Sequence, residues 1–330
     1  MFLGPVAQLV LSRPGRMHTP RPSYRLVAPL AALTLCVGCA FDATDAAPAE
    51  NADATVFGFE DLNGTDINGP DVNGKELNGK ELNGKELNGK ELNGITLDGS
   101  NLTAIHTDGS TSSGLALIGA EFDTTMGVGT PISIRIDNVE VEPSFYKKSS
   151  VYMYTVLYRF DANSSWQPFC GLRDGSPIRA VPLKGRWDYR QGVEGGGSKI
   201  NDPDMITFAC EGYTLQKCVR LGYEPWRKRN GVLLDDHHQT CVRVHRADYC
   251  GDGRAFTKNG TLINLYDDLG VQKDTETWAF ESEWSPDGAV CVKQQRIAGA
   301  KFAPDCSFEK PAAKCGNSID WDQTLISVEH

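Results

Sequence analysis

The stretch Ile132-Ser133-Ile134-Arg135-Ile136-Asp137-Asn138-Val139-Glu140-Val141 decides the fold class. Its isoleucines recur at every second position, which is the spacing of side chains on one face of a β-strand. The run Val151–Phe160 is rich in β-branched and aromatic residues, and Tyr152 and Tyr154 alternate within it. Similar runs occur at Leu115–Ile118, Leu262–Tyr266 and Trp278–Trp284. Gly, Asp, Asn and Pro separate these runs, so we expect a mainly β (α+β) domain with antiparallel strands.

Two short helices are expected in this domain. Thr214 can cap a helix that ends at Gly222, with Leu215 and Cys218 on one face. Asp235 or Asp236 can cap a second helix, which the pattern extends towards Cys250.

Composition and cysteine content narrow the class of protein. The chain has 330 residues, a net charge of −10 and ten cysteines. Its acidic balance argues against a nucleic-acid partner. The cysteines that follow Cys39 are Cys170, Cys210, Cys218, Cys241, Cys250, Cys291, Cys306 and Cys315. Their even number predicts four disulfides if the chain is exported. Spacing leaves the pairing open, with Cys210–Cys218 and Cys306–Cys315 as candidate local bridges.

Residues 1–38 have the features of an export signal. They contain Arg13, Arg16, Arg21 and Arg25 and no acidic residue, and an apolar run of 13 residues, 26–38, ends them. Such a run is too short to span a bilayer. Gly38-Cys39 resembles the end of a bacterial lipobox, which predicts a lipid anchor on Cys39 and a location in the periplasm or at the outer membrane or cell surface. The alternative is ordinary signal cleavage after Ala40.

The next two segments differ from a globular domain. Residues 39–60 are rich in Ala, Asp and Glu, which predicts a disordered acidic linker. In residues 61–106 an aliphatic residue recurs every five positions, and Lys-Glu-Leu-Asn-Gly occurs four times from Lys75. This period resembles that of the pentapeptide-repeat family, whose β-helix turns a corner every five residues. Lysines occupy positions that should point inward in such a coil, so we expect a short irregular coil or, preferably, a flexible spacer.

Residues 107–330 form the predicted cysteine-rich domain, and three motifs in it resemble one family. The central motif is His245-Arg246-Ala247-Asp248-Tyr249-Cys250-Gly251-Asp252-Gly253-Arg254. The other two are the stretches Phe208–Trp226, which includes Cys210 and Cys218, and Trp284–Cys291. Together they resemble the ADYC domain, which is found in exported proteins of myxobacteria and their relatives. The resemblance implies a domain boundary and an exported location, but no particular activity.

Two clusters of residues are candidates for a metal-binding site or a catalytic site. His238, Cys241 and His245 share one face of the second expected helix, and Cys and His are zinc ligands. In an exported chain Cys241 is expected to be oxidised to a disulfide, which would exclude a zinc site. We therefore prefer to interpret this cluster as a disulfide with surface histidines nearby. His245 and Asp248 are candidate acid–base residues, although Asp248 is better explained as a loop clamp paired with Arg246, Arg254 or loop amides.

These patterns predict a binding protein rather than an enzyme, since no catalytic signature occurs. The expected protein is anchored to a membrane by lipid, and its β domain binds an envelope protein or glycan without a cofactor. Some of the six tryptophans could be exposed and stack on sugars, although packing against disulfides is the preferred explanation for them. The alternative is an exported hydrolase that uses Asp248 and His245.

Overall fold

The computed structural model describes residues 65–67, 74–78, 83–84, 92–126, 130–203, 205–258, 261–273, 278–297, 306, 313–316 and 326–329. The chain divides into two units, residues 1–55 and 56–330, and all described residues belong to the second unit. The predicted signal, the linker and Cys39 therefore lie outside the described residues, as does part of the repeat.

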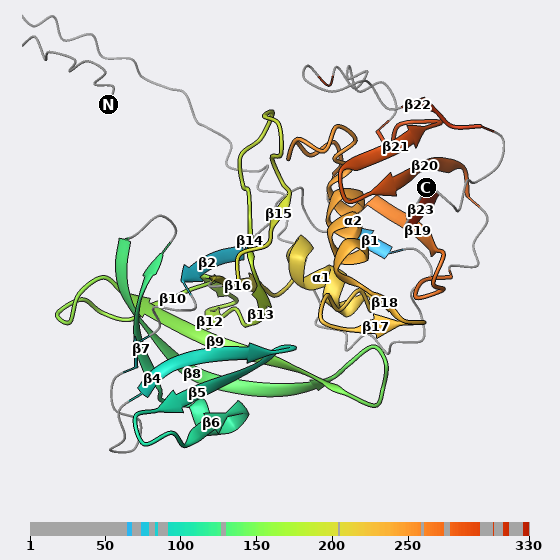
Figure 1. Cartoon of the computed structure of the whole chain (residues 1–330). Helices are drawn as coiled ribbons and strands as arrows, with labels where there is room; N and C mark the ends of the chain where they lie inside the picture. The colour runs from blue at the N-terminus through green and yellow to red at the C-terminus, as the bar shows by residue number, and fades with distance from the viewer. Residues whose placement is uncertain are drawn as a thin grey trace, which may run out of the picture. The chain divides into compact units, whose positions relative to one another are not determined.

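Antiparallel strands dominate this unit, which confirms the predicted fold class (Figure 1). The strands are β1 (Thr65–Ile67), β2 (Gly74–Asn78), β3 (Asn83–Gly84), β4 (Leu92–Asp98), β5 (Asn101–His106), β6 (Thr111–Ser113), β7 (Glu121–Met126), β8 (Thr130–Pro143), β9 (Ser150–Arg159), β10 (Gln167–Pro168), β11 (Leu172–Arg173), β12 (Ser176–Pro177), β13 (Ala180–Lys184), β14 (Arg186–Trp187), β15 (Lys199–Ile200), β16 (Met205–Cys210), β17 (Lys228–Arg229), β18 (Val232–Leu233), β19 (Thr261–Asp267), β20 (Phe280–Ser285), β21 (Gly288–Val292), β22 (Ala313–Lys314) and β23 (Ile326–Glu329). The helices are η1 (Gly114–Leu117, 3-10), α1 (Thr214–Arg220) and α2 (Asp235–Arg246).

The largest sheet closes on itself. Its strands pair in the order β10-β9-β13-β16-β2-β7-β3, and β8 pairs with both β7 and β9. Strands β8, β9, β13, β16, β2 and β7 therefore form a ring in which each strand is hydrogen-bonded to the next. The pairing of β8 with β9 is the most extensive in it, running from Ser133↔Arg159 to Pro143↔Ser150. A second sheet has the order β1-β19-β23-β20-β21-β22.

The ring has apolar contacts on both of its faces. Tyr154 and Phe208 lie in one core cluster with the isoleucines of β8 and with residues of the β4–β5 hairpin. Their neighbours Met153 and Ala209 lie in the other cluster, with α1, α2 and the second sheet. This division follows from the alternation of side chains along a strand.

The end of the repeat is part of this fold. Strands β4 and β5 pair with each other, and Gly99 begins the two-residue turn between them with a φ of +61°. In the described part of the repeat, β1 pairs with β19, β2 with β16 and β7, and β3 with β7, all antiparallel. These pairings differ from the self-stacking of a pentapeptide coil. Because residues between these strands lie outside the described part, the spacer remains a prediction.

Both predicted helices form, with different ends. α1 begins at Thr214, but Tyr213 is its N-cap, and no side chain caps it. α2 ends at Arg246 and not near Cys250, because Ala247 adopts the left-handed conformation with a φ of 50°. The amide of Asp248 then donates to the Arg243 carbonyl, which is the bond that ends a helix in a Schellman motif.

Candidate functional site

The α2 terminus holds the residues of the central sequence motif, and each has a structural partner. The Asp248 carboxylate forms an ion pair with Arg243, and both side chains are fully buried. It also accepts hydrogen bonds from the amides of Asp252, at 3.0 Å, and Gly253, at 2.9 Å. The predicted partners Arg246 and Arg254 are wrong, because Arg246 donates to the Gly253 carbonyl and Arg254 pairs with Asp252. The predicted loop amides are confirmed.

Tyr249 and Gly251 hold the rest of the motif in place. The Tyr249 ring stacks on Trp284 at 5.0 Å between centroids, and its hydroxyl donates to Glu281 Oε1 at 2.8 Å. Glu281 in turn pairs with Arg296, and both of these side chains are fully buried. A Cβ atom at the adjacent Gly251 would lie 1.8 Å from the Asp287 carbonyl oxygen, so only glycine fits there. The whole motif therefore fixes one loop against the second sheet.

This geometry favours a structural role for Asp248 over acid–base chemistry. Burial raises the pKa of the Asp248 carboxyl, and the Arg243 guanidinium opposes that shift. His245 is fully buried, and neither of its ring nitrogens has a hydrogen-bond partner. A general base must reach the proton it removes, and a side chain closed off from solvent does not meet a substrate.

The four predicted disulfides are present. The pairs are Cys170–Cys210, Cys218–Cys241, Cys250–Cys306 and Cys291–Cys315. The two local bridges proposed from spacing, Cys210–Cys218 and Cys306–Cys315, are wrong. Each observed bridge spans at least 23 residues and joins elements that meet only in the folded chain.

The structure does not assemble the three predicted zinc ligands. Atoms of Cys218, Cys241 and His245 lie within 4.8 Å of one another, but the two sulfurs are bonded to each other and offer no thiolate. His238 lies apart from that group, and its Nε2 donates to the Leu215 carbonyl at 3.0 Å. The face that these residues share is therefore a packing face of α2 against α1.

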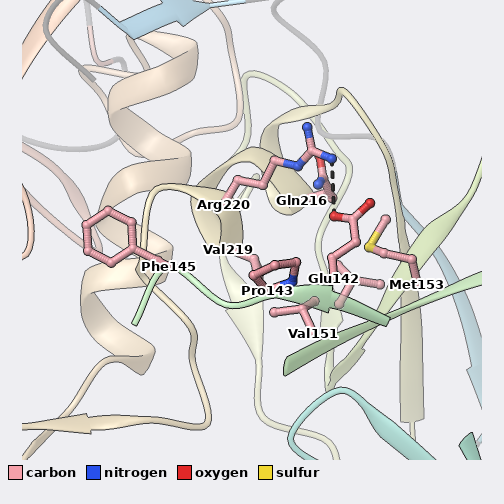
Figure 2. A pocket seen from close by; sticks show the side chains of 9 residues that line it. Glu142, Pro143, Phe145, Val151, Met153, Gln216, Val219 and Arg220 are labelled. Carbon is pink, nitrogen blue, oxygen red and sulfur yellow. Dashed lines mark hydrogen bonds and ion pairs between the residues drawn. The ribbon is translucent and has the colours of Figure 1, made fainter. Parts of the chain in front are cut away.

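Figure 2 shows a small cavity between the ends of β8 and β9 and helix α1. Pro143, Val151 and Val219 line it, and Arg220 donates to Glu142 at 3.3 Å beside it (Figure 2). Its volume of about 10 Å³ is no more than one water molecule requires, so it is a packing defect and not a ligand site.

A second cavity, of about 390 Å³, has the size of a small-molecule site. Trp226 is partly exposed in it. The residues that line it are Leu97, Gly99, Lys184, Gly185, Lys199, Asn201, Asp202, Pro203, Pro225, Trp226, Leu233 and Asp235. They come from the β4–β5 turn, the end of β13, the loop after β15, the segment after α1, and the approach to α2. The tryptophans were predicted as candidates for stacking on sugars, but no pattern in the sequence indicates that these segments meet around Trp226.

The β4–β5 turn approaches the Trp226 ring closely. A Cβ atom at Gly99 would lie 3.2 Å from Trp226 Cδ1, tighter than ordinary van der Waals contact. The positive φ of Gly99 also disfavours any other residue. The turn that ends the repeat therefore forms one wall of the cavity.

The charges around this cavity balance. Two lysines, Lys184 and Lys199, and two aspartates, Asp202 and Asp235, line it, and Lys199 forms an ion pair with Asp235. Asp202 is also 3.7 Å from Arg186. The wall thus combines hydrogen-bond donors and acceptors with an indole ring and carries no net charge. Such a surface favours a neutral polar ligand with an apolar face.

Comparison with known proteins gives the family. The sequence model of the ADYC domain matches residues 114–298, which is more than half of the chain. The chain therefore belongs to the ADYC domain family, a disulfide-rich β domain of a kind compatible with export. No curated protein and no solved structure matches it. Leu97 and Gly99, which line the cavity, precede the matched range.

Within the described residues, no helix has the length and apolar character needed to cross a membrane.

Proposed function

We propose that this chain is an exported, lipid-anchored envelope protein whose ADYC domain binds a neutral glycan in the Trp226 cavity. The observation that carries the proposal is a partly exposed indole within a cavity of balanced charge. Sugars present apolar C–H faces that pack on aromatic rings, and hydroxyl groups that both donate and accept hydrogen bonds. Trp226 supplies the ring, while Asn201, Asp202 and Lys184 supply the polar groups.

Replacing Trp226 by Ala is expected to weaken glycan binding about tenfold or more, since stacking on an aromatic ring contributes on the order of 1 kcal/mol in addition to area burial. Calorimetric titration with neutral tri- and tetrasaccharides of glucose, mannose and N-acetylglucosamine measures this. Trp166→Ala is the matched control, because Trp166 contacts the guanidinium groups of Arg135 and Arg159 and does not line the cavity. Equal loss in both variants, or no binding of any of these sugars, would refute the glycan proposal.

The membrane anchor rests on the sequence and is tested separately. Mass spectrometry of the protein from its own cell envelope is expected to show an acylated N-terminal Cys39 and no free thiol among the eight later cysteines. Cys39→Ala should move the protein from the membrane fraction to the soluble fraction. An unmodified chain that begins at residue 41 would instead support ordinary signal cleavage.

A further inference from the structure

We propose that the position between β16 and β7 is a strand-binding site for the five-residue segment Gly-Lys-Glu-Leu-Asn, and that residues 79–83 of the same chain are its second occupant. In the structure β2, residues 74–78, fills this position. The inference concerns the ring and is independent of glycan binding.

Strand β2 is an internal member of the ring. It pairs with β16 along its whole length, from Met205↔Asn78 to Ala209↔Gly74, and with β7 at Leu77↔Met126. Without it, β16 and β7 would each lose hydrogen-bond partners on one edge, and the ring would be open there. Unpaired strand edges readily accept another segment of suitable sequence.

A second segment of the same sequence follows immediately. Residues 79–83 repeat residues 74–78 without a difference. A shift of five residues therefore puts the same residue type at every register position, with Leu82 in place of Leu77 opposite Ile206. Register is normally fixed by the pattern of residues along the strand, and that pattern does not distinguish these two segments.

The flanking strands allow one such shift. β3 is the dipeptide Asn83-Gly84, which pairs with Asp123 and Phe122 of β7, and Asn88-Gly89 has the same sequence five residues later. After the shift, residues 90 and 91 would connect this dipeptide to β4, which starts at Leu92. Strands β3 and β4 contact each other, and a connection of two residues can span about 10 Å between the ends that it joins.

A second shift is excluded by β4. It would require Asn93-Gly94 in the place of β3, and both residues already belong to β4. The site therefore has two occupants and not four. Each shift transfers five residues from the connection before β4 to the connection between β1 and β2.

Proline substitutions in the full chain test the proposal, since proline removes the amide that a central strand needs. Glu76→Pro and Glu81→Pro are each expected to lower the folding equilibrium constant only about twofold, because the other segment remains. Glu76→Pro with Glu81→Pro should lower it by more than a hundredfold, far beyond the product of the single effects. Glu86→Pro is the matched control, and combined with Glu76→Pro it should add no further loss. Denaturant unfolding gives these constants.

Amide hydrogen exchange supplies the register. In the wild type the two registers are expected to share amide protection between residues 74–78 and residues 79–83, whereas in Glu76→Pro the protection should be confined to residues 79–83. The proposal is overturned if Glu76→Pro alone is as harmful as the double variant, or if the double variant is as stable as the wild type. A dimer of Glu76→Pro in native mass spectrometry would also overturn it, because a segment of a second copy would then fill the site.

Discussion

Replacing Arg243 by Met is expected to lower the free energy of unfolding by about 3–5 kcal/mol, the usual cost of removing one partner from a buried ion pair. Arg243 is fully buried and pairs with the Asp248 carboxylate. It also donates to the carbonyl groups of Pro286, at 2.9 Å, and Gly196, at 2.7 Å. Met fills part of the volume but leaves a buried carboxylate without its cation and carbonyls without their donor.

Urea unfolding at neutral pH measures this effect, and Arg190→Met is the matched control. Arg190 also pairs with an aspartate, Asp188, but its side chain is 69% exposed. Exposed pairs contribute little, so the control should change stability far less than Arg243→Met does. Similar effects in the two variants would contradict the structural role assigned to the Arg243–Asp248 pair.

Two strands of the ring, β8 and β9, were predictable from local sequence, whereas the other ring strands and the Arg243–Asp248 pair were not. The alternating run 132–141 lies within β8, and the run 151–160, rich in β-branched and aromatic residues, corresponds to β9. The run 115–118 was also expected to be a strand, but it forms most of the 3-10 helix η1 and its C-cap. The partner of Asp248 depends on the left-handed turn at Ala247, which brings the carboxylate back towards the helix. Proximity in sequence favoured Arg246 and Arg254, and no local pattern indicates Arg243.

The pairing of the cysteines and the Trp226 cavity also could not be predicted from local sequence. An even cysteine count indicates that bridges form, but Cys218–Cys241 requires α1 and α2 to pack together. The Trp226 cavity combines the last turn of the repeat with segments more than 80 residues later. The boundary predicted at residue 107 places the repeat outside the domain, and no local pattern indicates that Gly99 is a neighbour of Trp226.

Two buried histidines on α2 predict a loss of stability in mild acid. The pKa of His238 is lowered to about 4, chiefly by burial and also by the charge of Lys199, while the Leu215 carbonyl and Asp235 oppose the shift. Burial also lowers the pKa of His245 well below 6.5, with Lys217 and Arg296 adding to the effect. In the folded protein both rings are therefore neutral throughout the mildly acidic range.

The sign of the effect follows from proton uptake. In the unfolded chain a histidine has a pKa of about 6.5, so below that pH the unfolded chain binds protons that the folded chain does not. Stability is thus fully present above pH 6.5 and is lost as the pH falls towards 4. His238 alone accounts for about 3 kcal/mol of this loss at pH 4, and His245 adds to it.

Urea unfolding between pH 7 and pH 4 tests this expectation in the wild type and in two variants. His245→Leu removes a ring whose nitrogens have no hydrogen-bond partners, and His238→Gln retains a donor for the Leu215 carbonyl. Each variant should show a shallower decrease in stability with falling pH, whatever its stability at pH 7. The slope is the decisive quantity, because a packing defect lowers stability equally at every pH, whereas a suppressed protonation acts only below pH 6.5. Slopes equal to that of the wild type would mean that other groups govern acid unfolding.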